Sequence, residues 1–276
     1  MPDRAGVRLD VPLLVVGAVR STNDVARAEG RARVTELVPL GGVPALAVLA
    51  TEQTAGRGRA GRAWSSPPGT GLYLSIYLRP AWPPARAAWL TLAAALAVRD
   101  ACAAMLAPCT SGPPLLKWPN DLLSADDPAR KVGGILVETR TQHGTVDEAV
   151  IGIGLNLAPP VGGFAGAVAA TAGALVPDPL SAPDAGALAR VILDALAREV
   201  LALGGAPEAA AASLVTRARA ASPLWGRTVR FERGGREARG VARTWADDGG
   251  LEIELDGGAR VVVHAGDVAV EWGARP

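Results

Sequence analysis

The chain has 276 residues, of which 49% are hydrophobic and 20% are charged, and its formal net charge at pH 7 is +1. This length and apolar content are sufficient for a sizeable core in one or two globular domains. The near-neutral charge excludes a polyelectrolyte attraction of the whole molecule to nucleic acid or anionic lipid, so any basic segment acts locally.

The sequence predicts a cytoplasmic protein. No apolar run approaches the roughly 18 to 20 residues of a membrane span, and residues 1–10 lack the apolar core of a signal peptide. Cys102 and Cys109 lie seven residues apart in an alanine-rich segment, which is expected to place them on similar faces of one helix. Buried thiols are the favoured interpretation, ahead of a disulfide or a metal site.

Apolar runs and alternating patterns predict strands in the first part of the chain, at residues 13–16, 45–50, 72–78, 115–118, 132–139 and 149–157. Helical patterns occur at residues 21–28, 84–106, 184–203 and 207–220. Several strands follow one another without a helix between them, which favours an α+β fold with a mixed sheet over strict βαβ repetition. The residues between 158 and 187, rich in Ala, Gly and Pro, are expected to form a surface connection with a little helix.

At about Ser222 the sequence changes from a helical pattern to short β segments. Short β segments follow at residues 228–231, 238–245, 251–255, 259–263 and 267–272, separated by Gly- and Asp-rich turns. They predict a small, separate β-barrel. The expected domains are therefore residues 1–221 and residues 222–276.

Some side-chain types are rare in this chain, and their positions are informative. Of 28 basic residues only two are lysines, and amides are equally scarce. The rare residues are Lys117, Lys131, Asn23, Asn120, Asn156, Gln53 and Gln142. Because arginine presents a planar fork and lysine a compact point charge, we expect these exceptions at positions where geometry does not tolerate an exchange.

Residues 51–64, TEQTAGRGRAGRAW, carry three arginines and the pattern Gly-x-Gly-x-x-Gly. A dinucleotide-binding turn is excluded, because two prolines and then a strand follow, so that no helix offers its N-terminus. A P-loop is excluded because the chain has no Gly-Lys-Ser/Thr. Two interpretations stay open: a solvated hairpin tip, and a loop that orders over an anionic ligand, whose binding would offset the lost entropy.

Five motifs occur along the chain in this order: Ser21-Thr22-Asn23, Gln53 to Trp64, Lys117-Trp-Pro-Asn-Asp121, Lys131 to Glu138 and Gly152-Ile-Gly-Leu-Asn156. Together they resemble the biotin protein ligases, although each motif alone is weak. The resemblance implies a catalytic domain like that of class II aminoacyl-tRNA synthetases and biotin ligases, followed by an SH3-like domain. Both lysines and all three asparagines of the chain fall inside these motifs.

The resemblance also implies an ATP-dependent ligation in two steps. The carboxylate of biotin attacks the α-phosphate of ATP, with Mg²⁺, to give biotinyl-5′-AMP and pyrophosphate. A lysine of a biotin carboxyl carrier domain then displaces AMP. The first step brings an anion to a polyanion and needs positive charge, which the arginines and lysines of the motifs would supply. The glycine-rich loop would close over the adenylate and exclude water.

The resemblance assigns roles to individual residues. The expected catalytic residues are Lys131, Arg59, Asp121 and Lys117, with Asp121 orienting or deprotonating the incoming lysine. The expected biotin contacts are Ser21, Thr22, Asn23, Gln53, Gly56, Arg57, Arg59, Lys131, Gly133, Gly134 and Ile135. The expected ATP contacts are Arg57, Arg59, Arg62, Trp64, Lys117, Asn120, Lys131 and Asn156.

These residues also have simpler structural interpretations. Ser21 and Thr22 are suited to cap a helix, and Trp64 is suited to fill a core. Asn156 and Asp121 are common residue types at the ends of strands and in turns. Adjacent glycines within a strand can mark a bulge.

Functions of other classes compete with this hypothesis. Lipoate or octanoate ligation is the nearest enzymatic rival, and the arginine-rich loop favours biotin. A non-catalytic ligand sensor or a nucleic-acid-binding module would use the same loop, although the aromatic content of 4% is low for binding single strands. His143 and His264 are isolated, which argues against Ser/His and Cys/His hydrolases, and no His/Cys cluster has metal-ligand spacing.

The resemblance is to the ligase-only form of the family. Only 20 residues precede Ser21, too few for a winged-helix domain, so DNA binding is not expected. An edge-to-edge homodimer is consistent with the resemblance. One departure from the family's pattern is Arg20, at a position where relatives often carry an acidic residue.

Overall fold

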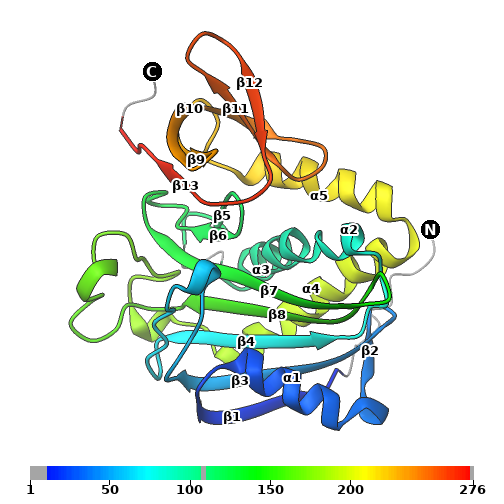
Figure 1. Ribbon diagram of the computed structural model, residues 1–276. Helices are drawn as coiled ribbons and strands as arrows, with labels where there is room; N and C mark the ends of the chain where they lie inside the picture. The colour runs from blue at the N-terminus through cyan, green and yellow to red at the C-terminus, as the bar shows by residue number, and fades with distance from the viewer. Residues whose placement is uncertain (1–10, 107–109, 274–276) are drawn as a thin grey trace, which may run out of the picture.

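The computed structural model describes residues 11–106 and 110–273 of the chain. Its largest element is an eight-stranded sheet in the order β1-β3-β4-β8-β7-β6-β5, with β2 paired to β3 (Figure 1). The strands are β1 (Leu13–Val19), β2 (Val38–Leu40), β3 (Val43–Gln53), β4 (Gly71–Leu78), β5 (Leu115–Lys117), β6 (Asp121–Leu123), β7 (Lys131–Gln142) and β8 (Thr145–Asn156). β1 runs parallel to β3 and the other described pairings are antiparallel, which confirms the predicted α+β fold with a mixed sheet.

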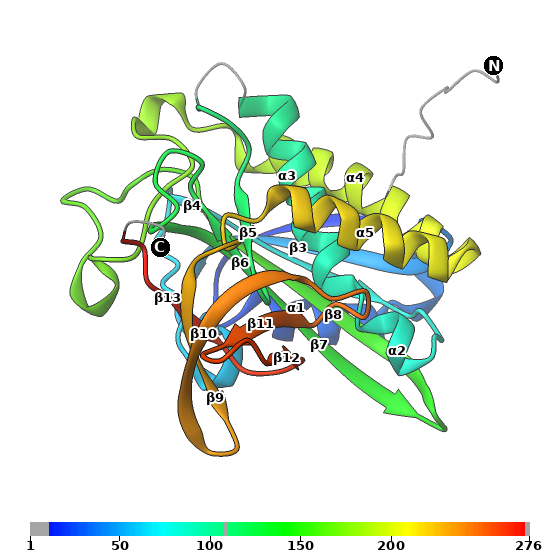
Figure 2. The ribbon, with the colours of Figure 1, turned by 90° about the horizontal axis from the view of Figure 1, so that it is seen from above.

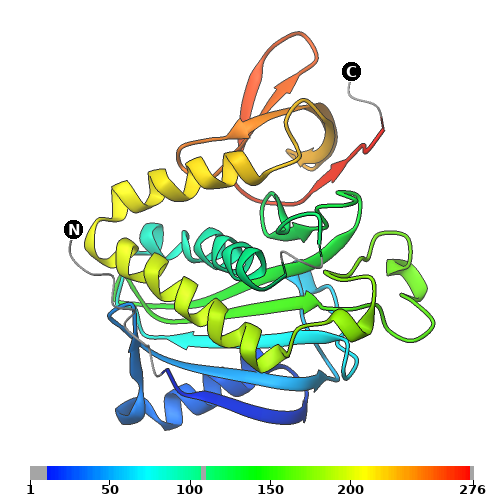
Figure 3. The same ribbon diagram turned by 180° about the vertical axis from the view of Figure 1, so that it is seen from behind.

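Helices cover both faces of this sheet (Figure 3). α1 (Thr22–Ala32) contacts β3, β4 and β8 on one face, whereas α3 (Leu90–Leu106), preceded by α2 (Pro84–Ala87), and α4 (Ala185–Gly205) lie on the other. α5 (Pro207–Ala221) packs on α4 and leads to the C-terminal strands. Short 3₁₀ turns occupy Val34–Glu36, Arg59–Gly61, Gly166–Val168 and Pro179–Ser181. The last two lie in the predicted surface connection.

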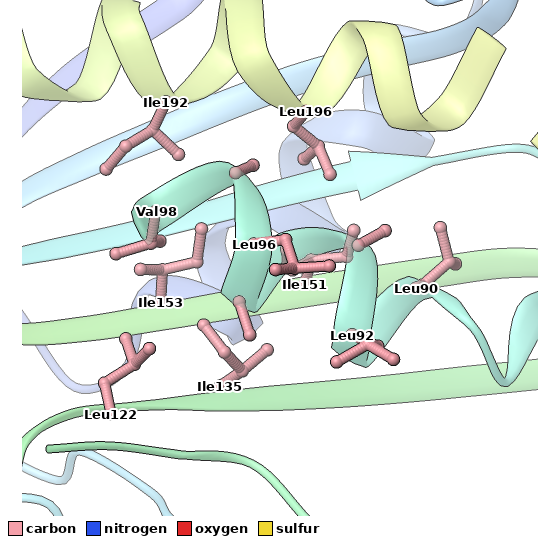
Figure 4. Close-up of a cluster of buried hydrophobic side chains, with 14 of the residues drawn as sticks. Leu90, Leu92, Leu96, Val98, Leu122, Ile135, Ile151, Ile153, Ile192 and Leu196 are labelled. Carbon is pink, nitrogen blue, oxygen red and sulfur yellow. The ribbon is translucent and has the colours of Figure 1, made fainter. Parts of the chain in front are cut away.

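The alternation of side chains along β3 produces a core on each face. Leu46 and Val48 belong to a small buried cluster with Ala26 of α1, whereas Ala47 and Leu49 belong to the main core. Successive side chains of a strand point to opposite faces of the sheet, so β3 contributes to both layers. Figure 4 shows the main core, in which side chains of α3 and α4 meet those of β7 and β8.

The apolar helix α3 belongs to this core. The helical segment Pro84–Leu106 is long and apolar enough for a membrane span by length and composition, so the expectation that the sequence holds no such run was wrong. The segment packs against β7, β8 and α4, and 61% of its apolar window is buried, as in the core helix of a folded domain. Burial raises the pKa of the Cys102 thiol to about 12, in agreement with the predicted buried thiol. Cys109 lies outside the described residues.

The C-terminal strands form a second, antiparallel sheet in the order β12-β11-β10-β9-β13 (Figure 2). They are β9 (Thr228–Arg233), β10 (Arg236–Trp245), β11 (Leu251–Leu255), β12 (Arg260–Val263) and β13 (Val268–Val270). Within the described part of the chain the outer strands β12 and β13 do not pair, so the sheet is open between them, and its five antiparallel strands are consistent with the predicted SH3-like domain.

One turn of this sheet is fixed to the first part of the chain. Trp118 donates a hydrogen bond from Nε1 to the carbonyl of Gly249, at 3.1 Å. Gly249 has φ of 85°, a conformation that favours glycine, and a Cβ there would lie 3.2 Å from the ring of Trp89. The contact therefore ties the β10–β11 turn to the connection between β5 and β6.

Candidate active site

A cavity of about 840 Å³ opens at the end of the main sheet where β3 and β8 end and β7 begins. Segments between residue 21 and residue 272 form its walls, including the start of α1, the loop after β3, the β5–β6 connection and β13. Most of the residues singled out by the sequence line this cavity: Ser21, Thr22, Asn23, Gln53, Arg57, Arg59, Arg62, Trp64, Lys117, Asn120, Asp121, Lys131, Gly134, Ile135 and Asn156.

Uncharged polar groups form one part of the cavity wall, at the start of α1. Ser21 occupies the N-cap position, but its side chain makes no capping hydrogen bond with the described residues, so capping does not explain this serine. The amide and the hydroxyl of Thr22 donate to Gln53 Oε1 at 2.8 and 3.0 Å. Ser75 Oγ lies 2.7 Å from Thr22 Oγ1 and 2.6 Å from Asn23 Oδ1. This network orients hydroxyl and amide groups that are suited to bind a polar, uncharged group of a ligand.

The loop after β3, residues 54–63, folds back as a short hairpin that we call the Gly/Arg loop. The amide of Gly58 donates to the carbonyl of Arg62 at 2.7 Å, and the amide of Trp64 donates to the carbonyl of Gly56 at 2.9 Å. A Cβ on Gly56 would lie 2.5 Å from the Trp64 carbonyl oxygen. Gly56, predicted as a biotin contact, therefore serves the closure of the hairpin and is not among the cavity-lining residues.

The arginines of the Gly/Arg loop reach carboxylates on both sides. Arg57 extends toward α1, where it contacts Asp24. Arg62 extends toward the C-terminal sheet and donates to Asp267, in the turn before β13, at 2.6 Å. Arg59 lies 3.9 Å from the same carboxylate and 3.4 Å from Asn120 Oδ1. The loop is thereby held between α1 and the C-terminal sheet.

Asp121 lies between the only two lysines of the chain. Its Oδ1 is 2.5 Å from Lys131 Nζ, and its Oδ2 is 2.8 Å from Lys117 Nζ. Lys117 is the last residue of β5 and Asp121 is the first residue of β6, and their backbones pair. The strand predicted at residues 115–118 is confirmed, whereas β6 was not predicted, because three residues are too short to be recognised from their pattern.

The electrostatic environment of Asp121 bears on its predicted role as a base. Its side chain is only 16% exposed, and burial alone would raise the pKa of the carboxyl. Lys117 and Lys131 outweigh this effect and hold the pKa below its usual value. A carboxylate with a lowered pKa is a weak base. The geometry therefore shows Asp121 orienting Lys117 and Lys131, which was not predicted, and argues against removal of a proton from the incoming lysine.

Trp64 contacts both Lys131 and the end of β8. Lys131 Nζ lies 5.4 Å from the centroid of the Trp64 ring, within the range of a cation–π contact. A Cβ on Gly154 would lie 2.6 Å from Trp64 Nε1, so the ring needs a glycine at this position. Asn156 continues the same wall and is fixed by a hydrogen bond from Nδ2 to the carbonyl of Gly173, at 2.8 Å.

The two adjacent glycines of β7 face opposite sides. A Cβ on Gly134 would approach Lys131 Nζ at 3.5 Å, on the cavity side. A Cβ on Gly133 would lie 2.6 Å from Leu155 Cδ2 and 3.1 Å from Leu122 Cδ1. The predicted contact of Gly133 with biotin is therefore not supported: this glycine lets side chains of neighbouring strands pack over β7.

The sequence singled out no residue of the C-terminal sheet or of the segment before α4 as part of the site. Val268, Ala269 and Val270 of β13 and Trp272 line the cavity, together with Phe164. The ring of Trp272 is 5.1 Å from the guanidinium carbon of Arg227. The alternating pattern of β13 identified it as a strand, but no local signal indicates that it reaches a cavity formed by distant segments.

A metal site and a histidine-dependent mechanism have less support in the described residues. No group of three or more His, Cys, Asp or Glu side chains in residues 11–106 and 110–273 is placed to hold a metal ion. His143 lies in the turn between β7 and β8, and His264 directly follows β12. Neither histidine lines the cavity, which removes the side chain that a Ser/His or Cys/His mechanism requires there.

Comparisons with known proteins connect this geometry to one family. Residues 33–156 match the Biotin/lipoate A/B protein ligase family, and residues 225–270 match the Biotin protein ligase C terminal domain. A biotin--[acetyl-CoA-carboxylase] ligase of Mycobacterium tuberculosis is 36% identical over 262 residues, which cover 92% of this chain and 87% of that protein. The bifunctional ligase/repressor BirA of Escherichia coli is 41% identical over 112 residues, which cover 41% of this chain and 33% of BirA.

Solved structures share the fold. The biotin protein ligase from Aquifex aeolicus, in complex with biotin and ATP, superposes with a TM-score of 0.70 at 24% identity, covering 94% of this chain and 98% of that chain. The ligase from Leishmania major, in complex with biotinyl-5-AMP, gives a TM-score of 0.58 at 24% identity and covers 92% and 99% of the two chains. On the match that spans nearly the whole chain at 36% identity, the protein belongs to the biotin protein ligase family.

Proposed function

We propose that this protein activates biotin with ATP to biotinyl-5′-AMP and transfers the biotinyl group to a lysine of a biotin carboxyl carrier domain. The observation that carries the proposal is the arrangement of one continuous cavity. Uncharged polar groups at the start of α1 form one part of its wall, and Lys131, Lys117 and the arginines of the Gly/Arg loop form another. The Mycobacterium tuberculosis relative is named for biotin ligation, and the Aquifex aeolicus structure contains biotin and ATP.

The ureido ring of biotin is a polar, uncharged group, and the network of Ser21, Thr22, Asn23 and Gln53 fits it. The carboxylate of biotin would then extend along Gly134 toward Lys131. A carboxylate oxygen forms a bond to the α-phosphorus of ATP while the bond to pyrophosphate breaks. Because both reactants are anionic, Lys131 lowers the barrier by attracting them to one point and by stabilising the charge of the transition state.

The nucleotide would occupy the part of the cavity near Trp64, Asn156 and Trp272. Aromatic rings are suited to stack on adenine, and an amide side chain is suited to hydrogen-bond its edge. Arg59 and Arg62 would exchange their contacts with Asp267 for contacts with phosphate oxygens. A phosphate, like the carboxylate, offers two acceptor oxygens to one guanidinium group, and it carries more negative charge. Arg57 is already engaged on the opposite side of the loop.

Mg²⁺ has no built site in the described residues, because both oxygens of Asp121 contact lysines and no cluster of potential ligands is present in residues 11–106 and 110–273. We propose that Mg²⁺ enters with the phosphates of ATP. This ion usually keeps several waters and binds through substrate phosphates and one or two carboxylates.

In the second step the ε-amine of the acceptor lysine attacks the carbonyl carbon of the mixed anhydride, and AMP leaves. Asp121 is proposed to hold Lys117 and Lys131 in place for this step, as it does without substrate. The attacking amine must be neutral, so its proton leaves to solvent or to the departing phosphate, because Asp121 is too weak a base.

The domain boundary, the cellular location and the oligomeric state are also proposals. We infer two domains that meet between residues 221 and 222, because α5 ends at Ala221 and the strands of the second sheet follow. A cytoplasmic protein would meet its ATP and carrier protein in the same compartment. Sedimentation equilibrium would test the edge-to-edge homodimer.

ATP–pyrophosphate exchange tests the proposed function. The exchange is measured with biotin, with lipoate, with octanoate and with no acid, at saturating ATP and Mg²⁺. The proposal expects exchange with biotin alone. Exchange with lipoate or octanoate would assign the protein to the related lipoyl ligases instead, and no exchange with any acid would make the cavity a ligand-binding site without chemistry.

A further inference from the structure

Arg57 is the one arginine of the Gly/Arg loop that turns toward α1. Its NH1 donates to Asp24 Oδ2 and its NH2 donates to Asp24 Oδ1, both at 2.7 Å, so the guanidinium and the carboxylate form a bidentate pair. The NH2 group also lies 3.4 Å from Glu138 Oε1. Asp24 is in the first turn of α1 and Glu138 is in β7, so the pair joins the loop to two separate elements.

Glu138 is the centre of this cluster. Its Oε2 accepts from Arg27 NH2 at 2.7 Å and from Asn23 Nδ2 at 3.1 Å, while its Oε1 faces Arg57. The carboxyl is 28% exposed, and burial alone would raise its pKa, but Arg27, Asn23 and Arg57 outweigh this effect and lower it. Glu138 is therefore ionised at neutral pH, with a fixed orientation. It also connects the cluster to the cavity, since Asn23 lines the cavity wall.

We propose that Asp24 and Glu138 are positioning residues that hold Arg57 and thereby keep the Gly/Arg loop closed over the bound adenylate. The proposal rests on the proposed function for the identity of the adenylate, but the contact itself is present without any ligand. The proposal gives the three arginines of the loop two different roles. Arg57 anchors the loop to the catalytic part of the chain, whereas Arg59 and Arg62 are left to exchange Asp267 for phosphate.

The geometry favours this division over the alternative that Arg57 binds ATP. A bidentate arginine–carboxylate pair has two parallel, charge-assisted hydrogen bonds. If Arg57 bound ATP instead, a single phosphate contact would have to compensate for the loss of both. A loop with three glycines loses much conformational entropy when it closes, so closure needs fixed contacts on the protein. The side chains of Arg57 and Asp24 are 37% and 51% exposed, which limits the strength of this pair alone. We therefore expect a moderate effect on the release of the adenylate, about three- to tenfold for each partner.

The test compares Asp24→Asn, Glu138→Gln and Arg57→Lys with the wild type. Asp24→Asn removes the charge but keeps the size of the side chain. Arg57→Lys keeps the positive charge but removes the planar guanidinium group that donates the two parallel hydrogen bonds. Glu29→Gln is the matched control, because it removes an exposed ion pair with Arg33, 2.8 Å long, on the same helix but away from the loop.

Two readouts are needed. The first is the rate at which preformed, labelled biotinyl-5′-AMP leaves the enzyme after a chase with excess unlabelled biotin. The second is the rate at which trypsin cleaves the loop after Arg59 and Arg62 in the protein without ligand, which does not depend on the proposed reaction. Thermal unfolding of each variant separates loop opening from loss of the fold, since a merely structural role would lower the melting temperature without changing release below it.

The proposal expects faster adenylate release and faster tryptic cleavage in Asp24→Asn, Glu138→Gln and Arg57→Lys, with unchanged rates in Glu29→Gln. Combining Asp24→Asn with Arg57→Lys should add little to either single change, because both remove the same contact. Wild-type rates of release and cleavage in the first three variants would overturn the proposal. Pyrophosphate exchange by the wild type reports separately on the proposed function, so failure of the function and failure of the loop contact are distinguishable.

Discussion

Asp121 binds Lys131 and Lys117 with different oxygens of one carboxylate, at 2.5 and 2.8 Å, and so fixes both lysines of the chain at the centre of the cavity. The arrangement resolves a conflict in the proposed first step. The ammonium groups of Lys117 and Lys131 are needed where the anionic biotin and ATP meet, but the two groups would repel each other without a negative charge between them. The carboxylate holds them in place before substrates bind, which is the preorganisation that electrostatic catalysis requires.

Lys131→Ala should slow formation of the adenylate by about two to three orders of magnitude, the range observed when one stabilising group of a transition state is removed. The measurement is a single turnover of biotin and ATP, with the adenylate quantified after acid quench. Lys131→Arg is the companion variant and should recover little, because a fork does not replace a point charge beside Asp121. A near-normal rate for Lys131→Ala would remove this lysine from the first step.

Asp121→Asn should slow both steps, not the transfer alone. The loss of the carboxylate frees Lys131 as well as Lys117, and Lys131 serves the first step. We expect a decrease of about tenfold or more in each step. Adenylate formation and transfer from isolated biotinyl-5′-AMP are measured separately. An unchanged first step with a slow second step would restore a role for Asp121 confined to the acceptor lysine.

Gly154→Ala should impair the nucleotide part of the site. Its methyl group would lie 2.6 Å from Trp64 Nε1 and 2.7 Å from Cε2, so the ring must move away from β8. We expect the KM for ATP to rise by about tenfold, with a smaller effect on the KM for biotin. Gly17→Ala in β1 is the control, because nothing lies within 4 Å of the added methyl group. Equal KM values for ATP in both variants would contradict the placement of Trp64.

Glu148 provides a test of electrostatics away from the cavity. It is buried, and Arg31 donates to both of its oxygens, with a closest distance of 2.6 Å. The hydrogen bonds from Arg31 are the main reason why the pKa of Glu148 is lowered. A lowered pKa stabilises the folded state above the unfolded pKa, and this stabilisation is lost as the pH falls through the folded pKa.

The free energy of unfolding of Glu148→Gln, measured in urea, should therefore be lower than that of the wild type at pH 7, by about 1–3 kcal/mol for a buried charged contact. The difference should shrink as the pH falls below the ordinary glutamate pKa of about 4.3, because the unfolded wild type takes up a proton there before the folded protein, in which the pKa of Glu148 is lowered. A difference that does not depend on pH between 7 and 3 would show that shape, and not charge, accounts for the effect.

The sequence predicted most elements of the fold because their signals are local. The alternation in residues 72–78 and the helical pattern of residues 84–106 are visible without any tertiary information. β2 and β6 were missed because three residues give too short a pattern. The strands of residues 228–270 are also visible locally, but the sequence does not show which of them pair with one another.

The candidate site was predicted in part. Rare residue types identified Lys117, Lys131 and Asn156, and all three line the cavity. The carboxylates that contact the arginines, Asp24 and Asp267, come from distant segments and carry no sequence signal that links them to the Gly/Arg loop. The sequence pattern alone also does not show to which face of the sheet each residue of a strand points. Gly133 and Gly134 were therefore assigned the same role although they face opposite sides.

The most direct measurement of the central claim is the mass of a biotin carboxyl carrier domain after incubation with this protein, biotin, ATP and Mg²⁺. The account predicts that the domain gains one biotinyl group on a single lysine, that the gain requires ATP, and that Lys131→Ala abolishes it on the same time scale. An unmodified carrier domain under conditions in which a known biotin protein ligase modifies it completely would contradict the account.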